Sequence, residues 1–294
     1  MDSQRSKSIF FLVAVGCLFF AGVAAILYPM ISNVYSLSTS RAVISSYGEQ
    51  VANMPEQEKS DLLEKAKKYN SDLAKGIYMD GNEKALCDKE GLMCYVDIPS
   101  LCIYLPVYYG ATDENLSKGC AFLENTSLPV GGKSTHCVIS GHTGLPSAEM
   151  FTKLDQIKKG AEFYIHVLDQ VLAYRVEVIS VVTPEKTEHL GIFKNKDYCT
   201  LLTCTPYGIN DKRLLVRGVR VEYKPPEPEK TEAQPSASET ADDGLTVEIN
   251  SQLAVIIAIA AAAVLLYAAG AVWLIMTICP PHRAKHAKKP RYRK

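Results

Sequence analysis

Two long apolar stretches lie near the two ends of the chain, and no charged residue interrupts either of them. The first runs from Ile9 to Met30 and the second from Leu253 to Ile278. At a rise of about 1.5 Å per residue, either stretch is long enough as a helix to cross a bilayer core of about 30 Å. The pattern therefore predicts two transmembrane helices.

Basic residues flank the outer end of each apolar stretch. Arg5 and Lys7 precede the first, and seven lysines and arginines follow the second between positions 283 and 294. The positive-inside rule then places both termini in the cytoplasm and the region 32–250 outside the cell. Two alternatives remain open. The first stretch, with small residues at 21–25, could be a cleaved signal peptide. The second is similar to the tail of a cell-wall sorting signal, although no Leu-Pro-x-Thr-Gly motif precedes it.

The pattern of apolar positions changes character between the two stretches. Residues 41–75 are polar with helical spacing and predict one or two amphipathic helices, and 76–91 is charged and loop-like. From position 92 onward, short runs rich in Val, Ile, Tyr and Thr alternate with turn residues, which predicts a sandwich or closed barrel. The expected strands are 94–98, 101–109, 135–140, 162–168, 171–182, 198–204 and 213–223. A short helix is expected over Ala148–Ile157, with Ser147 as its N-cap.

A segment rich in Pro, Glu, Ser and Thr follows the last expected strand and lacks the apolar content to fold. The chain is therefore expected to be mainly β, with helices before the barrel and a transmembrane helix on either side. The expected parts are a cytoplasmic N-terminus with a transmembrane helix (1–31), an N-terminal helical region (32–91), a β-barrel domain (92–223), a disordered linker (224–250), a second transmembrane helix (251–279) and a basic cytoplasmic tail (280–294).

Charge and composition exclude some partners. Lysines and arginines balance aspartates and glutamates at 32 each, so nothing suggests a nucleic-acid partner. The basic C-terminal tail is better explained as a topology determinant that lies against anionic lipid, which makes the membrane the first expected partner.

Seven of the nine cysteines lie between the two apolar stretches, at positions 87, 94, 102, 120, 137, 199 and 204. An odd number leaves one free thiol if the others pair, whereas a reducing habitat would leave all of them free. Cys87 with Cys94 is the favoured pair, because a flexible loop joins them. The pairing alone does not identify which thiol is reactive.

Three residue types that suit thiol acyl transfer stand on separate segments. Cys204 ends a β-prone run, Arg213 begins the next one, and His142 lies in a small-residue turn. The ordinary alternatives are a buried strand cysteine, a solvated arginine and a loop histidine. A zinc site is a further alternative, built from residues 136, 137, 142, 199 and 204, but its spacing matches no paired knuckle pattern. Gly141 and Gly144 favour a tight turn that presents His142 into a cleft.

These residues carry a resemblance to the sortases, which are membrane-anchored cysteine transpeptidases. The motif Thr-Leu-x-Thr-Cys stands at 200–204 and is followed by Arg213. The stretches 127–136, 139–148 and 204–210 are similar to those of the pilus-building class C sortases, and a second membrane segment is typical of that class. The resemblance covers about 90–223 and implies an eight-stranded sortase-type β-barrel.

The resemblance also implies the chemistry. Cys204 is the expected nucleophile, His142 the acid and base, and Arg213 the group that stabilises the oxyanion. The implied substrate is an LPxTG-like sorting signal on a pilin subunit or surface protein, and the implied acceptor is a lysine amine of a pilin. No cofactor and no metal are expected. Thr203, Thr205 and apolar residues of the 171–182 run are candidates for substrate binding.

One departure from the class C pattern concerns a lid that usually covers the cleft. No Asp-Pro pair occurs in the chain, so the lid is either absent or uses Tyr78 or Met79 as its plug. Two other functions remain open: a housekeeping-type sortase that anchors proteins to the cell-wall peptide, and a non-catalytic binding module on a sortase-like barrel.

Overall fold

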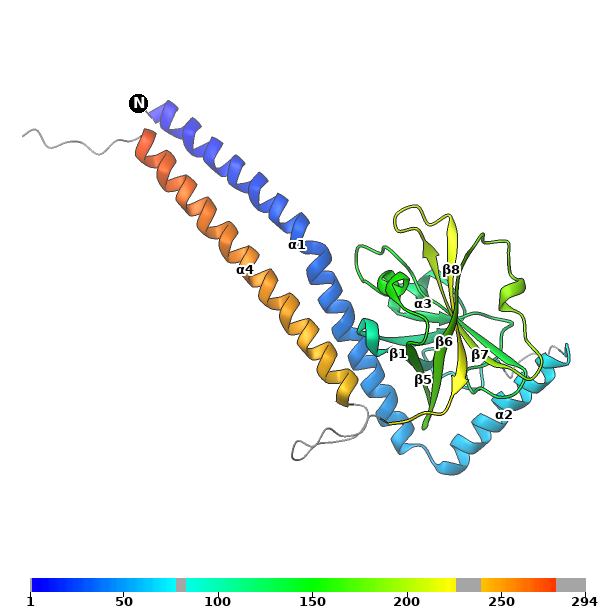
Figure 1. Cartoon of the computed structure of the whole chain (residues 1–294). Coiled ribbons are helices and arrows are strands. Elements are labelled where there is room, and N and C mark those ends of the chain that lie inside the picture. The colour runs from blue at the N-terminus through cyan, green and yellow to red at the C-terminus, as the bar shows by residue number, and fades with distance from the viewer. Residues whose placement is uncertain (1, 78–82, 226–238, 279–294) are drawn as a thin grey trace, which may run out of the picture. The chain divides into compact units, whose positions relative to one another are not determined.

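The computed structural model describes residues 2–77, 83–225 and 239–278. Its contacts divide the chain into two compact units. One consists of residues 1–28 together with 253–294, and the other is Pro29–Gln252. The first unit contains the apolar ends of the chain, and the second contains all the strands (Figure 1).

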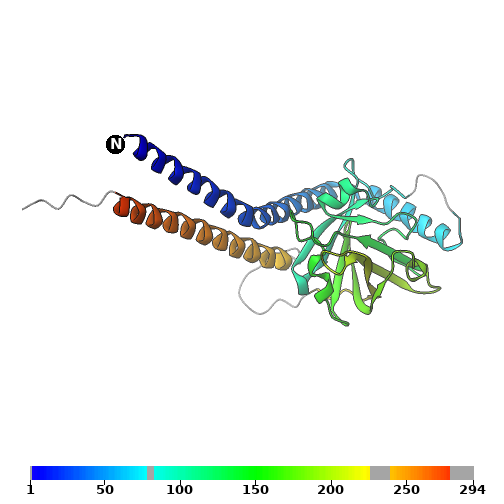
Figure 2. The same ribbon diagram turned by 90° about the horizontal axis from the view of Figure 1, so that it is seen from above.

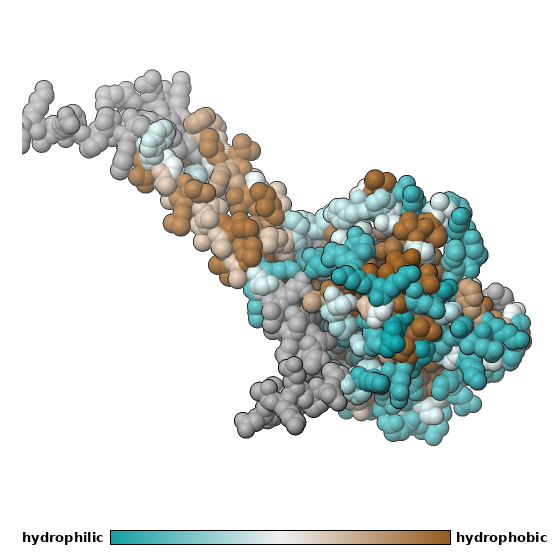
Figure 3. Space-filling view, in the orientation of Figure 1, coloured by the Kyte–Doolittle hydropathy of each residue, from teal (hydrophilic) through white to brown (hydrophobic). Residues whose placement is uncertain are grey.

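The apolar ends form helices, as the sequence predicts. α1 covers Asp2–Asn53 and α4 covers Glu239–Ile278, and in the first unit the two lie side by side (Figures 1 and 2). The Tyr267 ring contacts Phe19 and Phe20, with centroids 6.1 and 5.2 Å apart. Brown, apolar side chains cover much of the visible surface of these helices (Figure 3). Both are long and apolar enough to cross a membrane.

The strands of the second unit form a closed eight-stranded barrel in the order β1-β2-β3-β4-β7-β8-β6-β5, which confirms the predicted fold. Neighbouring strands are antiparallel except for β2 with β3 and β4 with β7. The strands are β1 (Leu92–Ile98), β2 (Ile103–Tyr109), β3 (Cys120–Phe122), β4 (Thr135–Ser140), β5 (Glu162–Val167), β6 (Gln170–Val182), β7 (Asp197–Thr205) and β8 (Lys212–Val221).

The short elements differ from the sequence prediction. The expected helix at 148–157 is a 3-10 helix, η2 (Thr152–Gln156), because Ala148 forms a bridge with Leu145 and Met150 has φ +42°. Strand β3 and helix α3 (Asp113–Lys118) were not predicted. The other two 3-10 turns are η1 (Pro99–Leu101) and η3 (Glu188–Leu190). α4 begins at Glu239, within the expected linker, and residues 226–238 of that linker lie outside the described residues.

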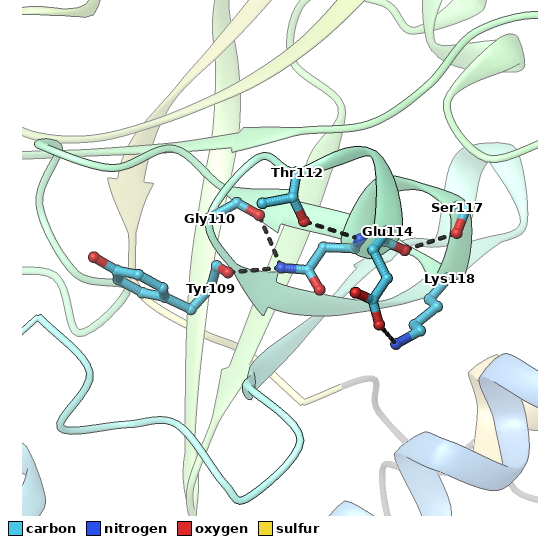
Figure 4. Close-up of polar contacts among 7 residues, drawn as sticks. Tyr109, Gly110, Thr112, Glu114, Ser117 and Lys118 are labelled. Atoms are coloured by element: carbon cyan, nitrogen blue, oxygen red, sulfur yellow. Dashed lines mark hydrogen bonds and ion pairs between the residues drawn. The ribbon is translucent and has the colours of Figure 1, made fainter.

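Helix α3 begins with a cap that its sequence explains. The Thr112 hydroxyl accepts a hydrogen bond from the Asn115 N–H at 3.2 Å, and Glu114 pairs with Lys118 at 2.7 Å (Figure 4). The Asn115 side-chain amide donates to the carbonyls of Tyr109 and Gly110 at 2.7 and 3.0 Å. These bonds fix the chain between β2 and β3, which lets the two strands lie parallel.

The helices before the barrel are held to it by buried polar contacts. In α2 (Glu56–Ala74), the Asn70 amide donates to the Leu128 carbonyl at 3.0 Å and its oxygen accepts from the Leu128 N–H at 2.7 Å. In α1, the Tyr47 hydroxyl donates to the Met93 carbonyl at 3.1 Å and accepts from the Leu168 N–H at 2.7 Å. These contacts join the two helices to backbone groups of the barrel unit.

Four cysteines lie inside the barrel. Cys94, Cys120, Cys137 and Cys199 are all at most 3% exposed. Burial raises the pKa of the thiols of Cys94, Cys120 and Cys199, which keeps these sulfurs protonated and unreactive. All of the described cysteines are free thiols, including Cys87 and Cys94, so the favoured disulfide between those two is not formed.

A carboxyl group is buried without a partner on the outer face of β1. The Asp97 side chain is 8% exposed and makes no hydrogen bond or ion pair with the described residues. Burial raises its pKa from 3.8 to about 7. On the neighbouring strand, burial lowers the pKa of His166 to about 4, and its ring stacks on Tyr95 with centroids 4.4 Å apart.

Asp97→Asn is expected to stabilise the barrel at pH 8 and to have little effect near pH 4. Because the folded-state pKa is raised, the wild-type carboxyl stabilises the fold fully below pH 3.8, and this contribution is lost as pH rises through about 7. A shift of this size corresponds to at most about 4 kcal/mol, less the cost of burying the amide. Thermal unfolding of the full chain in non-ionic detergent across pH 4–8 measures the difference.

The exposed Asp155 provides the matched control, because Asp155→Asn removes the same charge without relieving burial. The His166 contribution has the opposite sign, since its lowered pKa stabilises the fold above pH 6.5 and the effect is lost as pH falls through about 4. It is present in wild type and variant alike and cancels in the comparison. A stabilisation of equal size at pH 5 and pH 8 would contradict the explanation by burial.

Candidate active site

Cys204 and Arg213 lie opposite each other on the antiparallel strands β7 and β8, close to the turn that joins these strands. The register places the two residues directly opposite one another. Side chains at opposite positions lie on the same face, with Cβ atoms about 4.5–5.5 Å apart. Cys204 is half-buried, unlike the four cysteines inside the barrel. The predicted thiol and guanidinium therefore share one end of the barrel, and the thiol is accessible.

Backbone carbonyls of the β7–β8 turn hold the Arg213 guanidinium. Its Nη1 donates to the carbonyls of Asn210 and Lys212 at 3.2 and 3.1 Å. A guanidinium has five N–H donors in a rigid fork, so donors remain for a further ligand. The turn thus fixes the direction of the side chain without neutralising its charge.

A second charged group near Arg213 was not predicted from the sequence. Glu185 lies in the β6–β7 connection and is fully exposed. Its pKa is lowered by hydrogen bonds, first from its own backbone N–H and then from the Thr183 hydroxyl, with a smaller contribution from the charge of Arg213. The two groups are 28 positions apart in the sequence, and the pairing of β6 with β8 brings them near each other.

His142 lies at the same end of the barrel, because β4 runs parallel to β7. Ser140 pairs with Leu202, and the Gly141 N–H donates to the Leu202 carbonyl at 3.0 Å. Two residues further along each chain stand His142 and Cys204. The parallel pairing therefore brings all three predicted catalytic residues to one end of the barrel.

The chain around His142 is tightly packed. A Cβ atom added at Gly141 would lie 2.6 Å from the Phe151 ring, and Gly144 has φ +77°. Glycine is required at position 141 because a side chain would clash with the Phe151 ring, and at position 144 because its φ is positive. Both agree with the tight turn predicted from the sequence.

Thr203 joins the His142 loop to the strand that carries Cys204. Its hydroxyl donates to the Gly141 carbonyl at 2.7 Å and lies 2.6 Å from the Thr143 hydroxyl. Thr203 is only 2% exposed, whereas Thr205 is half-buried at the strand end. Thr203 therefore holds the loop in place. Substrate contact by either threonine stays a prediction.

Apolar side chains are exposed beside this end of the barrel. Tyr207 and Ile209 of the β7–β8 turn are 68% and 70% exposed, and Val181 near the end of β6 is 56% exposed. The next residue, Val182, pairs with Arg213. Exposed apolar surface of this kind is typical of a site for an apolar peptide segment. The possible lid residues Tyr78 and Met79 lie outside the described residues.

His136, one residue of the alternative zinc site, has other partners. His136 is buried, with Nδ1 2.8 Å from the Gly191 carbonyl and Nε2 2.7 Å from the Thr200 hydroxyl. Burial lowers its pKa. Within the ranges that the structure describes, no group of three or more His, Cys, Asp or Glu residues is arranged to hold a metal ion.

Comparison with known proteins decides the family. A family model described as "Sortase domain" matches residues 96–221. The crystal structure of Clostridium perfringens sortase C with the C-terminal cell wall sorting motif is 46% identical, with a TM-score of 0.59. The match covers 62% of this chain and 99% of that one. The chain belongs to the sortase family.

Other sortases of the same class are similar over the same region. Streptococcus pneumoniae sortase C is 43% identical with a TM-score of 0.58, and the match covers 62% of this sortase and 97% of that chain. Streptococcus agalactiae sortase C1 is 41% identical with a TM-score of 0.60, over 63% and 99%. Among curated relatives, Bacillus anthracis sortase A is 32% identical over 134 residues, which is 46% of this sortase and 62% of that protein.

Family membership gives the general chemistry. Sortases are cysteine transpeptidases, and the family acts on LPxTG-type cell-wall substrates. This sortase has one half-buried cysteine at a strand end, opposite an arginine and beside a histidine loop. The spatial arrangement of these three groups agrees with that chemistry.

Proposed function

We propose that this protein is a class C sortase that polymerises pilins. The observation that carries the proposal is the pairing of Cys204 with Arg213 across β7 and β8, beside the loop that holds His142. The class C solved structures support the choice of class, at 41–46% identity over nearly their whole length. The solved structure of the S. pneumoniae enzyme bears on pilin substrate specificity.

The proposed reaction begins with attack by the Cys204 thiolate on the threonine carbonyl of an LPxTG-like signal. Arg213 donates hydrogen bonds to the oxyanion that forms, because a guanidinium keeps its charge at any working pH. The Thr–Gly bond then breaks, and His142 gives a proton to the departing glycine amine. The product is a thioester between Cys204 and the substrate threonine.

The second half of the reaction resolves this thioester. The amine of a pilin lysine attacks the carbonyl, and His142 takes its proton. Collapse of the tetrahedral intermediate expels the Cys204 thiolate and leaves an isopeptide bond. The sulfur ends in its starting state, so the cycle needs no cofactor or external energy source.

The exposed apolar edge formed by Val181, Tyr207 and Ile209 is proposed to hold the Leu-Pro part of the signal. Apolar side chains favour such residues. Tyr207 and Ile209 follow Cys204 in the β7–β8 turn, and Val181 pairs with Leu214, the residue after Arg213. Thr205 is proposed to contact the signal from the strand end, and Thr203 to act through the loop that it bonds.

The proposed topology places the barrel outside the cell. The basic residues before α1 and after α4 favour a cytoplasmic location for both termini. The barrel is then tethered to the outer face of the membrane, where secreted pilins bearing a sorting signal emerge.

Choice of amine acceptor tests the class. The full chain in non-ionic detergent is incubated with an LPxTG peptide and an equimolar mixture of two acceptors. One is a pilin-like peptide whose only amine is a lysine side chain, and the other is a cell-wall-type peptide with a free N-terminal amine. We expect the lysine product in at least about tenfold excess, located by tandem mass spectrometry.

The matched control is the lysine peptide with its side-chain amine acetylated, which is expected to give no product. Preference for the N-terminal amine would replace the proposal with a housekeeping sortase. Binding of the LPxTG peptide without cleavage would instead indicate a non-catalytic module.

A further inference from the structure

A basic pocket lies between α2, the loop before β4 and the segment before β7. Its volume is about 640 Å³. Four lysines line it: Lys67 of α2, Lys75 directly after that helix, Lys133 of the loop, and Lys194 before β7. We call this the lysine pocket. Since its wall comes from three separate segments, the folded chain gathers charges that are far apart in the sequence.

The lysine pocket is remote from the catalytic end of the barrel. Thr135, which also lines the pocket, begins β4, whereas His142 follows the end of that strand. Lys194 precedes β7, and Cys204 lies near the end of β7. A strand rises about 3.3 Å per residue, so roughly 20 Å separates the pocket from the thiol. It is therefore not a part of the proposed peptide groove.

The positive charge of the pocket is mostly uncompensated. No aspartate or glutamate is among its lining residues. Lys75 is 3.7 Å from Asp72, which pairs more closely with Lys68 at 2.7 Å. Lys67, Lys133 and Lys194 make no ion pair within the described part of the chain. Like charges brought together at a concave surface favour an anionic ligand.

The loop of the pocket also presents backbone donors. The N–H groups of Gly131, Lys133 and Ser134 donate no hydrogen bond within the described residues. Gly131 and Gly132 have φ values of +63° and +122°, and Ser134 has +60°. Successive residues of unusual φ form turns whose N–H groups bind anions. A side chain at Gly131 would also approach Asp197, with its Cβ 2.8 Å from Oδ2.

Asp197 holds the loop of the pocket through hydrogen bonds. Its carboxylate accepts hydrogen bonds from the Gly132 N–H at 2.8 Å, the Tyr174 hydroxyl at 3.0 Å and the Thr135 hydroxyl at 3.3 Å. The Thr135 hydroxyl also donates to the Gly132 carbonyl at 2.7 Å. These bonds hold the loop in shape, and Asp197 makes no ion pair with the pocket lysines within the described residues.

We propose that the lysine pocket binds a ligand that carries two or more phosphate groups. Lysine ammonium groups together with free backbone N–H groups are the donors that recognise phosphate in proteins. At about 640 Å³, the pocket has room for more than a single phosphate group. Two or more anionic groups are needed to meet four separated lysines.

Isothermal titration of the full chain in non-ionic detergent tests the proposal with tripolyphosphate as the probe. The variant Lys133→Gln with Lys194→Gln is compared with Lys158→Gln with Lys159→Gln, which removes two exposed lysines elsewhere. We expect saturable binding that weakens at least about tenfold in the first double variant and less than about twofold in the second. Cys204→Ala should bind like wild type, so this result is independent of the proposed catalytic function.

A second probe, glycerophosphoglycerol, distinguishes a ligand with several phosphates from a lipid headgroup with one. It carries the single phosphate of a lipid headgroup, and we expect it to bind at least about tenfold more weakly than tripolyphosphate. Equal affinity for the two probes would overturn the requirement for two phosphates and assign a lipid headgroup. Lack of saturable binding, or equal weakening in both double variants, would overturn the site itself. Thermal unfolding of each variant shows whether the fold is retained.

Discussion

Replacing Cys204 by alanine is expected to abolish the covalent adduct that forms between this sortase and an LPxTG peptide. The proposed reaction passes through a thioester, and alanine has no atom that can form one. Loss of a covalent nucleophile typically costs at least about 10³-fold in rate, because the remaining groups only bind and polarise the substrate. Intact mass spectrometry of the full chain after incubation with the peptide measures the adduct directly.

Cys102→Ala is the matched control for this experiment, because Cys102 is the exposed thiol of the barrel unit and lies in the turn between β1 and β2. The control is expected to keep the wild-type adduct. Thermal unfolding should be similar for wild type and Cys204→Ala, since this cysteine is only half-buried. An adduct of unchanged mass and yield on Cys204→Ala would assign the chemistry to a different residue.

Replacing Arg213 by alanine is expected to lower kcat/KM for peptide cleavage by about 10²–10³-fold, which is the usual cost of removing one oxyanion donor. The reason is positional. Arg213 is directly opposite Cys204, and carbonyls of the turn orient its guanidinium. Steady-state cleavage of a fluorogenic LPxTG peptide gives kcat and KM separately. We expect most of the loss in kcat, because the oxyanion exists only in the transition state and the intermediate.

Two further variants show whether charge or geometry is responsible. Arg213→Lys keeps the charge but loses the planar fork, and we expect it to recover no more than about a tenth of the lost activity. Lys212→Ala removes a neighbouring exposed charge from the residue that stands opposite Thr205 in the strand register. This substitution is expected to change kcat/KM less than about twofold. A loss confined to KM would mean that Arg213 binds the substrate and does not stabilise the oxyanion.

The sequence predicted the barrel well because its long strands are runs rich in Val, Ile, Tyr and Thr that turn residues separate. All seven expected runs are strands, within a few residues of their predicted ends. β3 was missed because three buried residues, Cys120–Phe122, carry no measurable alternation. The helix expected at 148–157 was wrong because the apolar spacing there reflects burial of irregular backbone around Phe151. Short elements are set by tertiary contacts that a local pattern does not contain.

The candidate site was predictable only where its residues fall within motifs. Cys204, Arg213 and the His142 turn each have a local signature, and the structure brings them to one end of the barrel. The bond from Thr203 to Gly141 was not predictable, because it depends on the register of two parallel strands 62 residues apart. The lysine pocket had no signature at all, since α2 and two loops contribute one or two lysines each.

The unequal burial of the cysteines matters for covalent inhibitor design. Electrophilic warheads react with thiolates in water, and four of the barrel thiols are shielded from solvent. Cys87 is half-buried, and burial raises its pKa to about 11, which leaves little thiolate at neutral pH. Cys102 is therefore the main competitor of Cys204 for a warhead. A compound shaped to the apolar edge beside Arg213 gains its selectivity from that surface, because the Cys102 turn lies on a different pair of strands.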